Sequence, residues 1–370
     1  MEVWHGADFE LSRHAYVYFD REGKSLMNEI KQYIEENLFK TLYVLHPEYS
    51  ISGKLNEQAY RDIKELGTQV IINVDRNVLS DLFMAIKNGC FDACKNRKET
   101  TAFLLWIIKN NFGLSPYDAI KEQAFIEVHN KSGNKEIDLF NFFFDYVTPD
   151  VIIHAFYEEN VRFQSRTFQD ASEEENYDFL PDNADFLFLY ASILHLVFEL
   201  RSDKLYDEQF ESMVKWYFEE CLISQVGLTY CILLFTKDGI TRPHNYMNKN
   251  NKKVIHGCKN EAMDIYYFQE IDPRRYQSDK YTFLVATHDS VMRDVFENAF
   301  DFTGMSSKDD FLIKLCSYAP EVKRNKYIEI VLRESHNHKK TKVNSYNAYD
   351  IARKLCDQEE VRLMKLLENR

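Results

Sequence analysis

The sequence predicts an α/β protein with a central parallel sheet and extensive helical additions. Two apolar runs, "TQVIINVD" ending at Asp75 and "YTFLVATHD" ending at Asp289, each stop at an acid and lead into a helical pattern. Strands that alternate with helices are typical of a parallel sheet. Only 11 Gly and 7 Pro occur in 370 residues, which favours long helices in the rest of the chain.

Helical patterns fill most of the remaining sequence. "NVLSDLFMAIKNG" predicts a helix that ends at Gly89, and "TAFLLWIIKNNFG" predicts the next. "SPYDAIKEQAFIEVH" predicts a further helix, with Ser115 as its N-cap and Pro116 in its first turn. "FESMVKWYFEECLI" has one apolar stripe, and "NEAMDIYYFQEI" predicts a helix that carries Asp264 one turn after Asn260.

The composition excludes some classes of function. A formal charge of -13 argues against a protein that coats duplex nucleic acid or binds a strongly anionic membrane. The most apolar window, "FLFLYASILHLVF", is shorter than a bilayer span and reads as a buried helix, so no membrane partner is expected. Seven Cys at irregular positions suit free thiols in a reducing cytoplasm, which is the expected location.

The acids at the strand ends predict a metal site. The carboxyl ends of parallel strands lie at one edge of a sheet, where Asp75 and Asp289 are expected, and Asp264 and Glu122 are candidates to join them. Crowded carboxylates raise each other's pKa values and persist as anions when a divalent cation neutralises them, and Mg²⁺ or Mn²⁺ is the natural occupant. Such a site can activate water and stabilise the leaving oxygen in phosphoryl chemistry.

Three motifs, in order, resemble those of PIN-like nucleases. "VIINVDRNVL" is similar to the opening strand and Asp-x-Asn-Val-Leu of that family, "KNEAMDIYYFQE" to its third acidic motif, and "TFLVATHDSVM" to its fourth. The resemblance implies a three-layer PIN-like domain that hydrolyses phosphodiester bonds with Mg²⁺ or Mn²⁺, usually in RNA. It also implies roles for six residues: metal ligands Asp75, Glu122, Asp264 and Asp289, with Asn77 buttressing the first acid and Thr287 lining the site.

The chain departs from the family pattern in two ways. The gap of 142 residues between Glu122 and Asp264 is long, so we expect a nuclease domain at 67–300 with a helical insertion at about 131–225. Residues 1–66 and 301–370 are then helical extensions. The second acidic ligand is also ambiguous, because Asp118 and Glu127 lie near Glu122 on the same predicted helix; Glu122 is preferred for its position after the Pro116 turn.

The stretch from Thr241 to Lys259 is basic and has no acid. It reads either as a solvated loop or as a grip on the substrate backbone, in which case Arg242, Lys252, Lys253 and Lys259 are the candidate contacts. Its aromatic and Asn residues suit single-stranded RNA or DNA better than duplex. A regulatory protein partner and a homo-oligomer stay open.

Two rival functions fit the same residues. A PIN-like shell that has lost its metal would be a binding or scaffold protein with large helical surfaces. A haloacid-dehalogenase-type phosphatase also begins with an apolar strand and Asp, but its second Asp, the general acid, is replaced here by Asn77. The resemblance favours the nuclease, and such nucleases often serve in toxin-like growth arrest or antiviral defence.

Overall fold

The computed structural model describes residues 28–55, 57–127, 130–172, 183–220, 224–272, 280–337 and 347–368. The chain divides into two compact units, and neither is a continuous stretch of sequence. The first comprises Met1–Leu180 and Ile271–Ser290, and the second comprises Pro181–Glu270 and Val291–Arg370. The first unit is α/β, whereas the described part of the second is helical.

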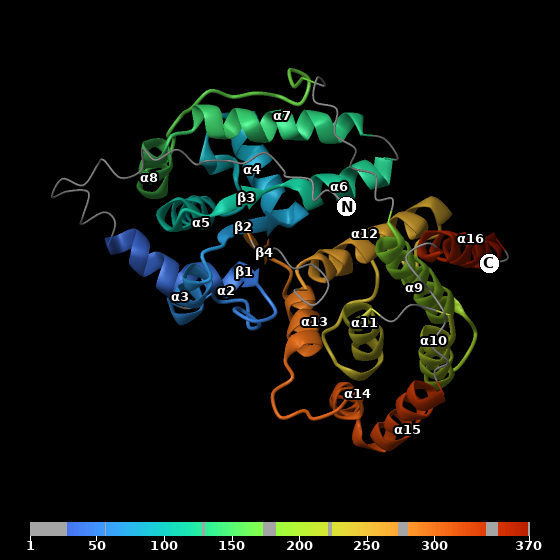
Figure 1. The fold of residues 1–370 in the computed structure, drawn as a ribbon. Helices are drawn as coiled ribbons and strands as arrows, with labels where there is room; N and C mark the ends of the chain where they lie inside the picture. Colours follow the sequence, from blue (N-terminus) through green and yellow to red (C-terminus); the bar gives the residue numbers. More distant parts are fainter. Residues whose placement is uncertain are drawn as a thin grey trace. The chain divides into compact units, whose positions relative to one another are not determined.

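The first unit contains a four-stranded sheet in the order β1-β4-β2-β3 (Figure 1). Its strands are β1 (Tyr43–Leu45), β2 (Gln69–Val74), β3 (Gly113–Ser115) and β4 (Tyr281–Thr287). β2 pairs in parallel with both β3 and β4, but β1 runs antiparallel to β4, with Tyr43 opposite Thr287. The expected parallel sheet is therefore present in β2, β3 and β4, and the antiparallel β1 makes the whole sheet mixed.

β2 and β4 are the two apolar runs that the sequence singled out. Val70, Ile72 and Val74 of β2 are buried, whereas Ile71 and Asn73 are half-buried, so the two faces of this strand are covered unequally. β4 is buried at its last four residues. Both strands run in the same direction, so their carboxyl ends, at Val74 and Thr287, meet at one edge.

Helices of the first unit pack around this sheet. α4 (Arg76–Asn88) follows β2 directly and ends, as predicted, at Gly89, which takes the left-handed φ of 62°. α4 contacts β4, and α6 (Tyr117–Glu127) contacts β2. The other elements of this unit are η2 (Ile34–Leu38), α2 (Phe39–Thr41), α3 (Glu57–Glu65), η3 (Phe91–Ala93), α5 (Arg97–Asn110), α7 (Lys131–Tyr146) and α8 (Pro149–Tyr157).

The second unit is built around α9 (Ala184–Arg201), whose side chains are buried along almost its whole length. This is the apolar window of the sequence, and it is the predicted buried helix. Among the residues that the structure describes, no helix is long and apolar enough to cross a bilayer. α9 packs against α10 (Tyr206–Glu220), α11 (Gln225–Thr236), α12 (Asn251–Glu270) and α16 (Ala348–Glu368). The unit also contains α13 (Ser290–Phe300), α14 (Lys308–Ser317) and α15 (Glu321–Asn337).

The structure differs from the expected division at three places. Residues 43–45, expected within a helical extension, form β1 of the sheet. α7 and α8, expected within an insertion, belong to the first unit. α12 begins at Asn251, so Lys252, Lys253 and Lys259 lie on the helix that carries Asp264 rather than in a loop before it.

Candidate metal centre in the first unit

Asp75 lies at the junction of β2 and α4, where the sequence predicted an acid at the end of a buried strand. It is the N-cap of α4, with an extended backbone and a carboxylate that accepts a hydrogen bond from the Asn77 amide nitrogen. The side chain is only 7% exposed. An N-cap carboxylate satisfies backbone donors at the start of the helix, so part of its role is structural.

Two side chains hold the Asp75 carboxylate in place. Asn77 Nδ2 donates to Asp75 Oδ2 at 2.6 Å, and Thr287 Oγ1 donates to the same oxygen at 2.5 Å. Thr287 is the last residue of β4 and is buried, so the hydroxyl is fixed by the strand that neighbours β2. The expected buttress by Asn77 and the expected placement of Thr287 beside the acid thus correspond to direct contacts.

Glu122 lies close to Asp75. Both carboxylates are buried, and one oxygen of each lies within 4.8 Å of one oxygen of the other. Glu122 is on α6, which packs against β2, and this packing brings the two acids together. Asp118, one turn earlier on α6, is also buried, whereas the side chain of Glu127 lies outside the described residues.

Asp289 completes the set of acids in the first unit. Its backbone nitrogen donates to Thr287 Oγ1 at 2.9 Å, so one hydroxyl bridges Asp289 to the Asp75 carboxylate. The pKa of Asp75 is raised: burial is the main cause, and the charge of Asp289 adds to it, against the lowering by hydrogen bonds from Thr287 and Asn77. A bound cation would stabilise the ionised form of such a carboxylate, which is buried and lies close to other acids.

A second group of polar residues fixes the loop between β4 and α13. His288 donates from Nδ1 to the Thr41 carbonyl at 3.0 Å, which assigns the proton to Nδ1, and its Nε2 lies 3.7 Å from Glu99 Oε1. Glu99 is buried on α5 and also accepts from the Thr41 hydroxyl. The His288 amide donates to Asn77 Oδ1 at 3.2 Å. The imidazole is therefore engaged by α2 and α5 and serves to hold the loop.

Sequence reasoning missed this supporting group and also the anchor of α4. Arg76, next to Asp75, forms a bidentate pair with Glu136 of α7 at 2.6 and 2.7 Å. Its guanidinium is thus committed to a buried acid. The adjacency of Arg76 to Asp75 is visible in the sequence, but its partner 60 positions away is not.

The remaining predicted residues belong to the second unit. Asp264 is half-buried on α12. Arg242, Lys252 and Lys253 are exposed, whereas Lys259 is half-buried, and its pKa is lowered mainly by burial, against the charge of Glu360. Lys259 therefore takes part in the internal packing of this unit.

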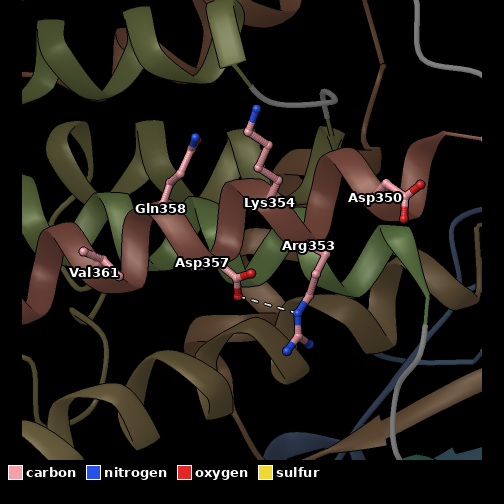
Figure 2. Close-up of a pocket in the computed structure, with 6 residues that line it drawn as sticks. All are labelled: Asp350, Arg353, Lys354, Asp357, Gln358 and Val361. Atoms are coloured by element: carbon pink, nitrogen blue, oxygen red, sulfur yellow. Dashed lines mark ion pairs between the residues drawn. The ribbon is translucent and has the colours of Figure 1, made fainter.

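The hollow along α16 is a different kind of site. Figure 2 shows it lined by residues of that helix alone, with an ion pair of 3.5 Å between Arg353 and Asp357. A catalytic site requires polar groups that converge from several elements, and the residues that line this hollow all come from one helix. The acids at the edge of the sheet are the better candidate.

Comparison with known proteins adds no relative: no family model, no curated protein and no solved structure matches the chain. The function is therefore inferred from the residues and their geometry.

Proposed function

We propose that the chain is a metal-dependent nuclease with a PIN-like α/β domain, and that RNA is its preferred substrate. The main support is the approach of two buried carboxylates, Asp75 and Glu122, to within 4.8 Å at the carboxyl edge of the sheet. Open α/β sheets build their sites at this edge. Two like charges kept out of water at such a separation are costly unless a cation lies between them.

The residues of this edge have distinct proposed roles. Asp75 and Glu122 hold the cation, and Asp289 adds a third negative charge. Asn77 and Thr287 orient the Asp75 carboxylate through their hydrogen bonds, as the supporting residues of metal sites do. When bound, Mg²⁺ or Mn²⁺ lowers the pKa of a water and polarises the phosphate. Asp264 remains a sequence prediction as a further ligand.

The geometry also bears on the phosphatase alternative. In that mechanism the residue two positions after the first Asp donates a proton to the leaving group. Here that residue is Asn77, whose amide already donates to Asp75 Oδ2. An amide cannot act as a general acid in this way, so the nuclease is the better reading of this site.

Two measurements test the proposal. Mn²⁺ binding is followed by calorimetry, and cleavage of labelled single-stranded RNA and DNA is followed with Mn²⁺ and with EDTA. We expect Asp75→Asn and Glu122→Gln to weaken Mn²⁺ binding by about tenfold or more and to abolish cleavage. Asp118→Asn tests whether Asp118 rather than Glu122 is the second ligand, and Asp264→Asn tests the residue on α12.

Asp150→Asn is the matched control, because Asp150 is an exposed carboxylate in the first turn of α8 of the same unit. It should leave binding and cleavage unchanged. Wild-type protein that neither binds Mn²⁺ nor cuts either substrate would refute the nuclease and favour the scaffold, in which Asp75 is only the N-cap of α4. Mn²⁺ binding that is equal in wild type and Asp75→Asn would place the cation elsewhere.

A further inference from the structure

The second unit displays a basic surface that the proposed nuclease chemistry does not use. From Gly239 to Asn260 the chain has five Lys or Arg, two His and no acid, although acids outnumber Lys and Arg by 59 to 46 in the whole sequence. Five of these side chains are exposed, and we call them the basic loop surface: Arg242, His244, Lys249, Lys252 and Lys253.

The segment between α11 and α12 has a defined backbone conformation that hydrogen bonds hold in place. The Tyr246 amide donates to the Pro243 carbonyl at 3.1 Å, and the Asn248 amide donates to the Asn245 carbonyl at 2.8 Å, so two turns follow each other. The two turns overlap at Asn245, which has a left-handed φ of 60°. Arg201 of α9 donates from Nη1 to the carbonyls of Tyr246 and Asn248, at 2.8 and 3.2 Å. These bonds attach the loop to α9.

The loop also lies directly on α12. A Cβ atom at Gly257 would come within 1.8 Å of the His244 carbonyl oxygen, so only glycine permits this approach. Asn250 Oδ1 accepts from the amides of Lys252 and Lys253 at 3.0 and 3.4 Å and caps the start of the helix. The cations of the surface thus stand on a fixed backbone, which lowers the entropy that they lose on binding.

Arg242 is positioned differently from the lysines. Its guanidinium lies 5.4 Å from the centre of the Tyr246 ring and donates to the Tyr246 hydroxyl at 2.6 Å. Burial raises the pKa of Tyr206 on α10, and the nearby Arg242 guanidinium counteracts this rise. A guanidinium held on an aromatic ring is a flat cation of the kind on which an unstacked base can pack.

We propose that the basic loop surface binds single-stranded nucleic acid. Lys249, Lys252 and Lys253 would neutralise backbone phosphates, and Arg242 with Tyr246 would contact a base. A duplex keeps its bases stacked and cannot offer one to Arg242, which favours the single strand. This inference does not depend on the metal centre, because it concerns binding by the second unit.

Other anionic partners fit less well. An acidic protein partner would need an apolar centre to its interface, and Met247 is the only large exposed apolar side chain described in this segment. An anionic membrane would need several such side chains for insertion. The surface presents positive charges, Asn amides and the Arg242 guanidinium beside the Tyr246 ring. Proteins bind single strands through groups of these kinds.

The test measures binding without cleavage. Anisotropy of a labelled 12-nucleotide RNA of mixed sequence is titrated with full-length Asp75→Asn protein in EDTA, over a series of salt concentrations. Lys252→Glu/Lys253→Glu should weaken binding by about tenfold or more. It should also reduce the slope of log affinity against log salt by about 1.4, because each phosphate contact on a single strand contributes about 0.7.

The matched control is Lys215→Glu/Lys365→Glu, which makes the same change in net charge at exposed lysines of α10 and α16. It should alter affinity less than about twofold. Lys249→Glu/Lys253→Glu is a second surface variant, used if the first has a lowered unfolding temperature. Equal losses in control and surface variants, or an unchanged salt slope, would overturn the proposal, as would equal competition by poly-aspartate or by duplex RNA at matched charge.

Discussion

Asp75 illustrates how one residue combines a structural and a proposed catalytic role. Its carboxylate caps α4 and accepts from Asn77 and Thr287, yet its pKa is raised because burial outweighs these hydrogen bonds. At neutral pH the ionised Asp75 carboxylate therefore lowers the stability of the folded protein, in spite of its hydrogen bonds. The capping and the charge can be separated by substitution, because Asn caps a helix about as well as Asp.

We expect Asp75→Ala to be clearly less stable than Asp75→Asn in the absence of metal. Alanine removes the cap, which costs about 1 kcal/mol, and leaves the buried Thr287 hydroxyl without its acceptor, which costs about 1–3 kcal/mol. Asparagine retains an oxygen for at least one of these bonds. Urea unfolding in EDTA measures the difference, and equal stabilities of the two variants would show that the contacts of Asp75 do not stabilise α4.

The acids of the candidate site could be found in the sequence, but their supports could not. Asp75 and Asp289 stand out because each ends an apolar run that the fold turns into a parallel strand. His288 is supported by Thr41, 247 positions earlier, and by Glu99 on α5. These partners meet only because the chain folds back on itself, and no local pattern marks them.

At the level of elements, long periodic segments were predictable and short strands were not. β2, α4, α9 and β4 follow from apolar runs and helical spacing. β1 and β3 have three residues each, too few to show an alternation, and their strand form depends on pairing with β4 and β2. The early start of α12 at Asn251 was hidden by a polar, Asn- and Lys-rich first turn.

Three helices of the second unit meet at a buried charged network around His195. His195 Nδ1 lies 2.9 Å from Glu359 Oε2 of α16, and the imidazole stacks on Trp216 of α10 at 4.4 Å. Its Nε2 lies 3.6 Å from Glu199 Oε1 but has no hydrogen-bond partner among the described atoms. Lys204 neutralises Glu199 at 2.8 Å, so the network already balances that acid without a proton on His195.

This network predicts a loss of stability on acidification. Burial lowers the pKa of His195 and outweighs the two nearby carboxylates, which raise it. Below the ordinary histidine pKa of about 6.5, the unfolded chain takes up a proton that the folded chain does not, so the free energy of unfolding falls as pH decreases. The contribution is at most about 1.4 kcal/mol per pH unit and ends below the folded pKa.

Urea unfolding between pH 7.5 and 5.5 checks this sign. The wild type should lose more stability over that interval than His195→Gln, which lacks the titrating group. If both proteins lose the same stability over this interval, titration of His195 does not cause the pH dependence. A wild type that gains stability relative to the variant would mean that Glu199 and Glu359 hold His195 protonated.

On the scale of the whole molecule, the sequence indicated an interrupted domain, and the structure has two discontinuous units. The chain passes from the first unit to the second after Leu180, returns at Ile271 and leaves again after Ser290. The returning segment contains β4, which lies between β1 and β2 in the sheet (Figure 1). The first unit therefore takes one of its central strands, with Thr287 and Asp289, from a distant part of the sequence.

A fragment of residues 1–172 should consequently fail to fold cooperatively. Without β4, β1 loses its partner in the sheet, and β2 loses the strand that pairs with all six of its residues. The apolar edge that remains is a template for aggregation, and a domain with net stability of about 5–15 kcal/mol cannot spare a central strand. Circular dichroism and urea titration of the fragment measure whether it unfolds cooperatively.

Co-expression with residues 183–370, which restores β4, should recover a soluble complex with a cooperative transition. A monomeric fragment 1–172 that unfolds cooperatively alone would show that β4 is dispensable to the sheet.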